Sequence, residues 1–173
     1  MSRRQHDELV LSIYPTTRGI TYTLFESPLT PIDWGLKHAN GNDKNARSLE
    51  IVVQLCKALR PDTLVIEKSE PETSKRSERI RRLHALIAGF AEAENLTLVR
   101  YAQATVKETF REAGAITRYE IAQAITSYIP AFEHHMPRVK KLWQSEDLRF
   151  SLFDAAALAL THFAVIPDDG EPP

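Results

Sequence analysis

The fold of this protein is decided by residues 9–25, which read LVLSIYPTTRGITYTLF. Residues 9–13 are a short, nearly continuous apolar run, which is the pattern of a strand buried on both faces. Residues 16–19 have the composition of a turn, and residues 20–25 are rich in β-branched and aromatic side chains. The stretch therefore predicts a β-hairpin, and residues 32–37 alternate well enough to add a third antiparallel strand.

After this meander, helical and strand-like segments alternate along the chain. The expected strands lie at residues 63–66 and 96–99, the expected helices at 49–59, 80–90, 105–113, 117–128 and 147–165, and a long loop at 130–144. Strands joined by crossover helices require a mixed sheet with helices on its faces. The sequence therefore predicts an α/β fold.

The composition fits one ordinary globular domain and narrows the functional classes. The chain has 173 residues, and its 22 Lys and Arg nearly balance its 23 Asp and Glu. A nucleic acid or an acidic membrane would therefore have to be held by a local basic patch, because the net field is weak. The single cysteine, Cys56, excludes an intramolecular disulfide and a cysteine-based zinc site.

The two ends of the chain are expected to lie outside the folded domain. We expect an N-terminal tail at residues 1–7, a single domain at residues 8–166 and a disordered C-terminal tail at residues 167–173. The charged start leads into no signal-peptide core, and no apolar stretch approaches the ~20 residues that span a bilayer. We therefore expect a cytoplasmic protein without a membrane partner.

Two acidic residues stand out because of their apolar surroundings. Glu67 directly follows the buried strand at 63–66, and Asp154 lies in a helix that is otherwise too apolar to face water. Ligands collect outside the strand ends of such a sheet, and an ionised group on an apolar surface is costly unless it is paired or binds metal. If the two carboxylates converge, they suit Mg²⁺ or Mn²⁺ and phosphodiester hydrolysis. The alternatives are a solvated strand-end charge for Glu67 and a helix-start charge for Asp154.

Several short motifs follow one another in an order that matches a known family. They read IYPTTRG at residues 13–19, LVIE at 64–67, ATVK at 104–107 leading to TRYEIAQA at 117–124, and DAAALA at 154–159 followed by Thr161 and His162. This set resembles the RuvC-type Holliday-junction resolvases of the RNase H-like superfamily. The resemblance implies an RNase H-like fold, whose five-stranded mixed sheet begins with three antiparallel strands and is flanked by helices. It also implies metal-dependent action on branched DNA, and a homodimer.

The sequence departs from the family pattern at two metal-ligand positions. The family's first-strand Asp is Tyr14 here, and the acidic or His residue three before its last Asp is Ser151. A phenol with a pKa of about 10 is a poor Mg²⁺ ligand at neutral pH. The metal ligands carried over are therefore Glu67 and Asp154. If the last helix begins early enough, Asp147 shares a face with Asp154 and could be a third catalytic carboxylate; alternatively, Asp147 is a first-turn charge.

Basic residues form two groups that could contact nucleic acid. One group begins the helix after Glu67, and the other fills the loop before the last helix together with Trp143, whose ring could stack on a splayed base. Both groups could instead be solvated surface, with Trp143 buried as an anchor. The nucleic-acid-binding residues expected from these groups and from the hairpin turn are Arg18, Lys75, Arg76, Arg79, Arg82, Arg138, Lys140, Lys141 and Trp143.

These observations predict a protein that binds nucleic acid. The resemblance to the RuvC-type family implies that this nucleic acid is structured or branched, and that it is DNA rather than RNA. Cleavage through Glu67 and Asp154 would make it an endodeoxyribonuclease that depends on Mg²⁺ or Mn²⁺. The alternative is a catalytically inactive scaffold or partner-binding protein on the same fold, in which the hydroxyl of Tyr14 fills the space between the two carboxylates. A further alternative is an enzyme that acts on a small phosphorylated molecule in the same cleft.

Overall fold

A computed structural model of the chain describes residues 8–69, 77–136 and 149–165. Its elements in chain order are β1 (Val10–Pro15), β2 (Gly19–Ser27), β3 (Thr30–His38), α1 (Lys44–Leu59), β4 (Thr63–Glu67), α2 (Glu78–Ala93), β5 (Thr97–Tyr101), α3 (Gln103–Arg111), α4 (Arg118–Tyr128), the 3₁₀ helix η1 (Pro130–His135) and α5 (Arg149–Val165). None of the described helices is long and apolar enough to cross a membrane.

The strands form one five-stranded sheet in the order β3-β2-β1-β4-β5. β2 pairs antiparallel with both β1 and β3, whereas β4 runs parallel to β1 and β5 runs parallel to β4. The predicted mixed sheet with an antiparallel meander is confirmed. Because β1, β4 and β5 run in one direction, their carboxyl ends at Pro15, Glu67 and Tyr101 share one edge of the sheet. We call this the carboxyl edge.

The turn between β1 and β2 closes tightly at residues 16–18. The backbone N–H of Thr16 donates to the Gly19 carbonyl oxygen at 2.8 Å, and Thr16 Oγ1 accepts from the Gly19 N–H at 3.1 Å. A Cβ at position 19 would lie 2.0 Å from the carbonyl oxygen of Lys37 in β3. Glycine is therefore required for the close approach of β2 and β3 at this point.

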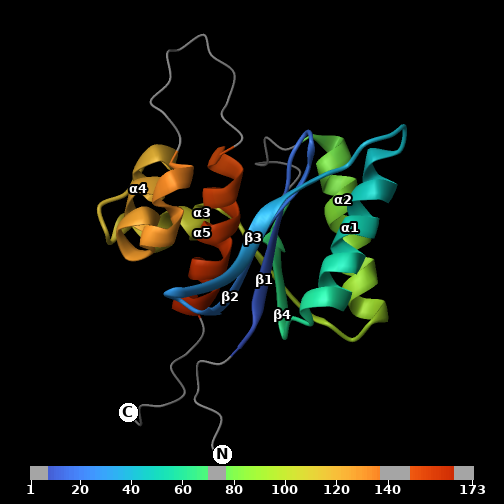
Figure 1. Ribbon diagram of the computed structural model, residues 1–173, viewed down its shortest axis with the longest axis horizontal. Coiled ribbons are helices and arrows are strands. Elements are labelled where there is room, and N and C mark those ends of the chain that lie inside the picture. Colours follow the sequence, from blue (N-terminus) through green and yellow to red (C-terminus); the bar gives the residue numbers. More distant parts are fainter. Residues whose placement is uncertain (1–7, 70–76, 137–148, 166–173) are drawn as a thin grey trace, which may run out of the picture.

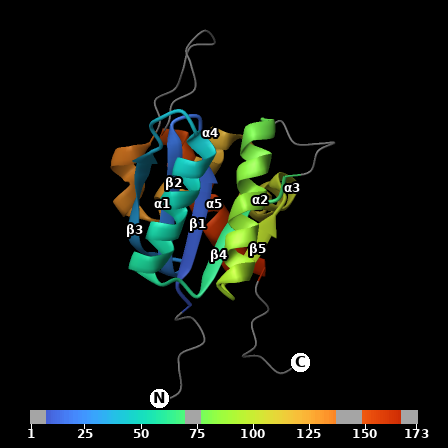
Figure 2. The ribbon, with the colours of Figure 1, turned by 90° about the vertical axis from the view of Figure 1, so that its right-hand side faces the viewer.

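Helices cover both faces of the sheet (Figures 1 and 2). α1 and α2 pack on one face over a core that includes Leu11, Ile13 and Ile66, and α3, α4 and α5 lie on the other face over Val10 and Val65. Side chains of β1 and β4 thus alternate between two hydrophobic cores, as expected for strands buried on both faces.

Helix α5 lies between the sheet and the outer helices α3 and α4, and it contacts all of them. Ala155, Ala156 and Ala159 are fully buried, and Leu152 and Leu158 are nearly so. A helix enclosed in this way needs apolar side chains around most of its circumference, which is why α5 shows no amphipathic stripe. Asp154 is the exception in this apolar segment, and it marks the side of α5 that faces a cavity.

The prediction of a continuous loop over residues 130–144 is wrong in its first part. Residues 130–135 form η1, and Phe132 inside it is fully buried. The Phe132 ring packs edge-on against Trp34, with 5.0 Å between centroids, and against Phe25 and Phe153, each at 6.2 Å. One aromatic anchor in a short 3₁₀ segment leaves no periodic pattern in the sequence. The rest of this loop, and both predicted tails, lie outside the described residues.

Candidate functional site

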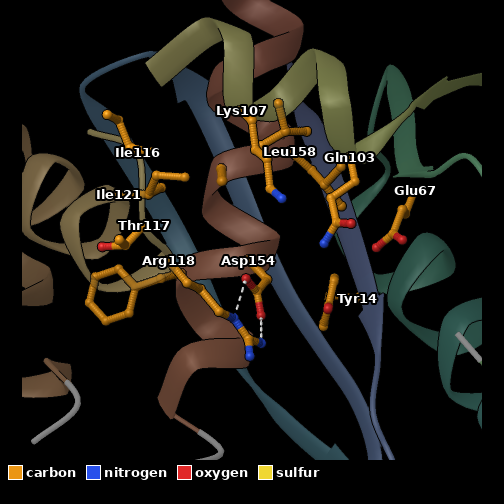
Figure 3. A pocket seen from close by; sticks show the side chains of 13 residues that line it. Tyr14, Glu67, Gln103, Lys107, Ile116, Thr117, Arg118, Ile121, Asp154 and Leu158 are labelled. Atoms are coloured by element: carbon orange, nitrogen blue, oxygen red, sulfur yellow. Dashed lines mark hydrogen bonds and ion pairs between the residues drawn. The ribbon is translucent and has the colours of Figure 1, made fainter. Parts of the chain in front are cut away.

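A cavity of about 480 Å³ opens beside the carboxyl edge of the sheet. It is formed by the ends of β1 and β4 together with α3, α4 and α5, as the close-up in Figure 3 shows. Its apolar wall includes Ile116, Ile121, Phe153 and Leu158. The polar side chains that line it are Tyr14, Glu67, Gln103, Lys107, Thr117, Arg118 and Asp154.

The structure brings Glu67 and Asp154 to the same cavity. Glu67 is the last residue of β4 and is only 8% exposed, whereas Asp154 projects from α5 and is half-buried. Tyr14, near the end of β1, lies between the two carboxylates in the view of Figure 3. The strand end and the helix therefore supply acidic groups to one cleft, as the sequence pattern indicates.

Asp154 forms an ion pair with Arg118, a residue not singled out from the sequence. Arg118 Nε donates to Asp154 Oδ1 at 3.1 Å, and Arg118 Nη2 donates to Asp154 Oδ2. The guanidinium also lies over the ring of Phe150, 4.9 Å from its centroid. A carboxylate held by two parallel N–H donors is fixed in orientation as well as in charge.

The acidic groups of the cavity stabilise the charged form of Arg118. Burial alone would lower the pKa of Arg118, but the hydrogen bond and charge of Asp154 outweigh it, with further contributions from Tyr14 and Glu67. The net effect raises the pKa of Arg118 above its ordinary value. The guanidinium is therefore a permanent cation in this cavity.

Helix α4 places Arg118 at the cavity because the helix begins with a capping box. Thr117 Oγ1 accepts from the backbone N–H of Glu120 at 3.1 Å, and Glu120 Oε1 accepts from the backbone N–H of Thr117 at 3.0 Å. The hydrogen bonds from Thr117 lower the pKa of Glu120. An arginine in the first turn interacts unfavourably with the helix dipole, and an acidic partner from another helix, here Asp154, offsets this interaction. That conflict is the signal by which Arg118 could have been found from the sequence.

Cations also gather on the α1 and α2 side of the carboxyl edge. Arg18 lies exposed in the β1–β2 turn, and Lys44 Nζ donates to the Thr17 carbonyl oxygen of the same turn at 2.6 Å. Lys68 directly follows β4, and Arg82 lies in the first turns of α2. We call this group the basic rim; its members are Arg18, Lys44, Lys68, Arg79 and Arg82.

Arg79, like Lys44, also holds parts of the fold together. Its Nη2 donates to the Thr16 carbonyl oxygen and its Nη1 to Asn45 Oδ1, both at 3.1 Å. Asn45 Nδ2 in turn donates to the Arg79 carbonyl oxygen at 3.1 Å. Arg79 therefore ties α1 and α2 to the β1–β2 turn. The other predicted nucleic-acid contacts, Lys75, Arg76, Arg138, Lys140, Lys141 and Trp143, lie outside the described residues.

Comparison with known proteins identifies solved structures with a similar fold. No family model and no curated protein sequence matches the chain. Thermus thermophilus RuvC, solved in complex with a Holliday junction substrate, matches with a TM-score of 0.63 and 16% identity, over 90% of this chain and 92% of that one. This chain has the RuvC-like RNase H fold.

Two further solved structures share that RuvC-like fold. The yeast mitochondrial Holliday junction resolvase matches with a TM-score of 0.67 and 14% identity, over 94% of this chain and 82% of that one. The fowlpox virus Holliday junction resolvase matches with a TM-score of 0.58 and 15% identity, over 90% of this chain and 98% of that one. The prediction of a RuvC-like RNase H fold is confirmed.

Ser151, where the resemblance implies a metal ligand, has a packing contact instead. Its hydroxyl is hydrogen-bonded to the hydroxyl of Thr21 at 2.8 Å, and both side chains are buried where α5 packs on β2. Tyr14, the other departed position, lines the cavity and is half-buried.

The described residues of this RuvC-like chain do not fit a divalent metal ion. Across residues 8–69, 77–136 and 149–165, no group of three or more His, Cys, Asp or Glu side chains could hold one. Both oxygens of Asp154 accept hydrogen bonds from Arg118, and Tyr14 offers a phenol, which binds a hard cation less well than a carboxylate does. Asp147, the third predicted carboxylate, lies outside the described residues. The Mg²⁺ or Mn²⁺ site expected at Glu67 and Asp154 stays a prediction.

Proposed function

We propose that this protein binds branched DNA, of the four-way-junction kind, across the carboxyl edge of its sheet. The observation that carries the proposal is the basic rim, which gathers cations at this edge of a chain whose net charge is only −1. Support also comes from the solved RuvC-like structures, because the Thermus and fowlpox proteins are described in complex with Holliday junction DNA.

The arrangement suits a phosphate backbone rather than a small ligand. Arg18 and Arg82 are exposed at the rim, where Arg82 also pairs with the exposed Glu78 at 2.7 Å. Lys107 brings a further cation into the cavity from α3. Each phosphate that such a cation neutralises releases counterions, so binding should weaken steeply as salt rises. A small phosphorylated substrate would be enclosed by its site, whereas these cations are spread along an open edge.

The proposal is tested by the fluorescence anisotropy of a labelled four-way junction and of a linear duplex, measured across a salt series. We expect the junction to be bound more tightly than the duplex. The double variant Arg18→Gln and Arg82→Gln should weaken junction binding by about tenfold and reduce the salt slope by roughly 1–2. Arg60→Gln is the matched control, because Arg60 is exposed at the opposite end of α1 from Lys44. Equal loss in the control, or no binding of either DNA, contradicts the proposal.

A homodimer is part of the same proposal. Two copies of the chain would present two carboxyl edges to the arms of one junction, and the resemblance implies such a pair. Sedimentation of the protein with excess labelled junction tests this point. Two chains per junction are expected, and a stable complex with one chain contradicts the dimer but leaves DNA binding in place.

Metal-dependent cleavage of the same DNA is the second candidate function. It is favoured by one observation, the presence of Glu67 and Asp154 in a single cavity on a RuvC-like fold. Cleavage of this kind would require Asp154 to exchange its contact with Arg118. Cuts in a labelled junction that need Mn²⁺ and disappear in Glu67→Gln would establish this function over binding alone.

A further inference from the structure

We propose that the guanidinium of Arg118 takes the place of a divalent metal ion in this cavity, so that the cleft does not take up Mg²⁺ or Mn²⁺. The inference concerns cation binding and does not depend on the proposed binding of DNA. It rests on three features of the described residues: the contacts of Asp154, the charge of the cavity, and the identity of the neighbouring side chains.

The first feature is the geometry around Asp154. Arg118 reaches both carboxylate oxygens, through Nε to Oδ1 at 3.1 Å and through Nη2 to Oδ2. A magnesium ion binds a carboxylate oxygen at about 2.0–2.1 Å in an octahedral shell. Because the guanidinium lies against both oxygens, an ion can bind Asp154 only by displacing hydrogen bonds that are already made.

The second feature is the balance of charge. The acids Glu67 and Asp154 line the cavity together with the cations Lys107 and Arg118, so the formal charges of the ionised lining residues cancel. Glu67 is buried, and the Arg118 and Asp154 side chains are only 38% and 19% exposed, so solvent screens the pair incompletely. A dication would add two positive charges beside Arg118, and the repulsion between them favours exclusion of the dication.

The third feature is the set of side chains around the acids. Tyr14 occupies the position beside Glu67 and Asp154 in Figure 3, and a phenol near neutral pH is a poor ligand for a hard cation. Ser151, one turn before Asp154, directs its hydroxyl to Thr21 of β2. Two carboxylates would therefore have to hold a metal without help from either position, and Asp154 already binds Arg118.

The pair also explains how α4 and α5 are held beside the sheet. Arg118 packs over the Phe150 ring of α5 while its guanidinium binds Asp154 one turn further along the same helix. A metal ion in a carboxylate cleft would likewise neutralise acidic side chains from different elements. Here Arg118, a side chain of the protein itself, neutralises Asp154.

The test is a Mn²⁺ titration followed by electron paramagnetic resonance of the free ion, with no DNA present. We expect the natural chain to show no site with a dissociation constant below about 1 mM, since an ion would have to displace Arg118 from both oxygens of Asp154. Arg118→Gln should bind one Mn²⁺ at least about tenfold more tightly than the natural chain, because it uncovers both oxygens of Asp154. Adding Asp154→Asn to Arg118→Gln should remove this gain.

Two comparisons make the result specific. Arg60→Gln removes one exposed arginine at the far end of α1 and should leave Mn²⁺ binding unchanged. Arg118→Lys keeps a cation beside Asp154 but loses the contact with both oxygens, so its Mn²⁺ affinity should lie between those of the natural chain and Arg118→Gln. Circular dichroism confirms that each variant is folded. A tight Mn²⁺ site in the natural chain, or a folded Arg118→Gln with unchanged affinity, overturns the inference.

A measurement on the natural chain alone covers the case in which Arg118→Gln does not fold. Between 1 mM Mn²⁺ and EDTA the melting temperature should differ by less than about 2 °C, because a ligand no more concentrated than its dissociation constant stabilises a protein only slightly. A rise of several degrees in Mn²⁺ that EDTA reverses would show a real metal site, and it would overturn the inference without touching the proposal of DNA binding.

Discussion

Arg118 at the start of α4 and Asp154 in α5 form an ion pair with two hydrogen bonds, and this pair lines the cavity at the carboxyl edge. It accounts for an aspartate in a helix that is otherwise apolar, because an ionised side chain at such a place must be paired. It also joins two helices that pack on each other outside the sheet. An ion pair within the chain thus holds two of the charged groups that line the cavity.

Breaking this pair should cost stability in a way that a double-mutant cycle can isolate. We expect Asp154→Asn and Arg118→Gln each to lower the free energy of unfolding by about 1–2 kcal/mol, since each leaves a charge without its partner in a half-buried place. The double variant should cost less than the sum of the single variants, with a coupling of about 1 kcal/mol. Urea unfolding measures all three variants, and additive effects would show that the pair contributes nothing.

The close approach at Gly19 makes a prediction about the hairpin. Gly19→Ala should destabilise the protein by at least about 2 kcal/mol, because its Cβ would lie 2.0 Å from the Lys37 carbonyl oxygen and β2 and β3 would have to separate. Gly89→Ala in α2 is the control. No atom lies within 4 Å of a Cβ added there, and alanine in a helix should stabilise by about 0.5–1 kcal/mol. Thermal unfolding of both variants checks the contrast, which equal shifts would refute.

The single cysteine should be slow to react in the folded protein. Burial raises the pKa of Cys56 from 9.0 to about 11. At pH 8 the reactive thiolate fraction is then about 100-fold lower than for an ordinary thiol. Reaction with a disulfide reagent, followed by absorbance, should be slow in buffer and should reach the rate of a free thiol in urea. A fast reaction in buffer would mean that Cys56 is accessible.

The protein should lose stability at alkaline pH because of Tyr22, which lies on the face of the sheet covered by α1 and α2. Burial, followed by the hydrogen bond and charge of Asp33, raises the pKa of Tyr22 to about 12. The folded protein then keeps a proton that the unfolded chain loses near pH 10, so this contribution is complete below pH 10 and falls as the pH rises toward 12. The Tyr22→Phe variant lacks this group. Between pH 10 and pH 12 its free energy of unfolding should therefore fall by up to about 2 kcal/mol less than that of the natural chain. Denaturant titrations at several alkaline pH values test this, and parallel losses in both proteins contradict it.

Local patterns in the sequence were sufficient for most of the fold. The hairpin, the crossover strands and the helices follow from apolar periodicity and turn residues, and the observed elements and sheet order confirm them. β5 extends beyond the predicted residues 96–99 because its pairing with β4 continues through Arg100 to Tyr101. A polar residue ends an apolar pattern, but it does not end a hydrogen-bonded ladder. The 3₁₀ helix around Phe132 was missed for a similar reason, since its anchor is a single aromatic ring.

The candidate site was less accessible to sequence reasoning because its main contact is long-range. Glu67 and Asp154 could be found from their apolar surroundings, but the partner of Asp154 lies 36 residues away and follows no periodic rule. For Arg79 the sequence pattern indicated a function in DNA binding but not the structural contacts of the side chain. Its place in a run of basic residues suggests a phosphate contact, whereas its guanidinium also carries hydrogen bonds to Thr16 and Asn45. Charge patterns alone do not separate these two uses of an arginine.

The most direct test of the account uses labelled four-way-junction and linear duplex DNA, incubated with the purified protein in Mn²⁺ or in EDTA and examined for both retardation and cleavage. If the cleft binds DNA and Arg118 is its cation, the junction should be retarded more strongly than the duplex. The retardation should be the same in Mn²⁺ and in EDTA, and neither DNA should be cut. Cuts that appear only with Mn²⁺ and vanish in Glu67→Gln would contradict that account and make the protein a metal-dependent nuclease.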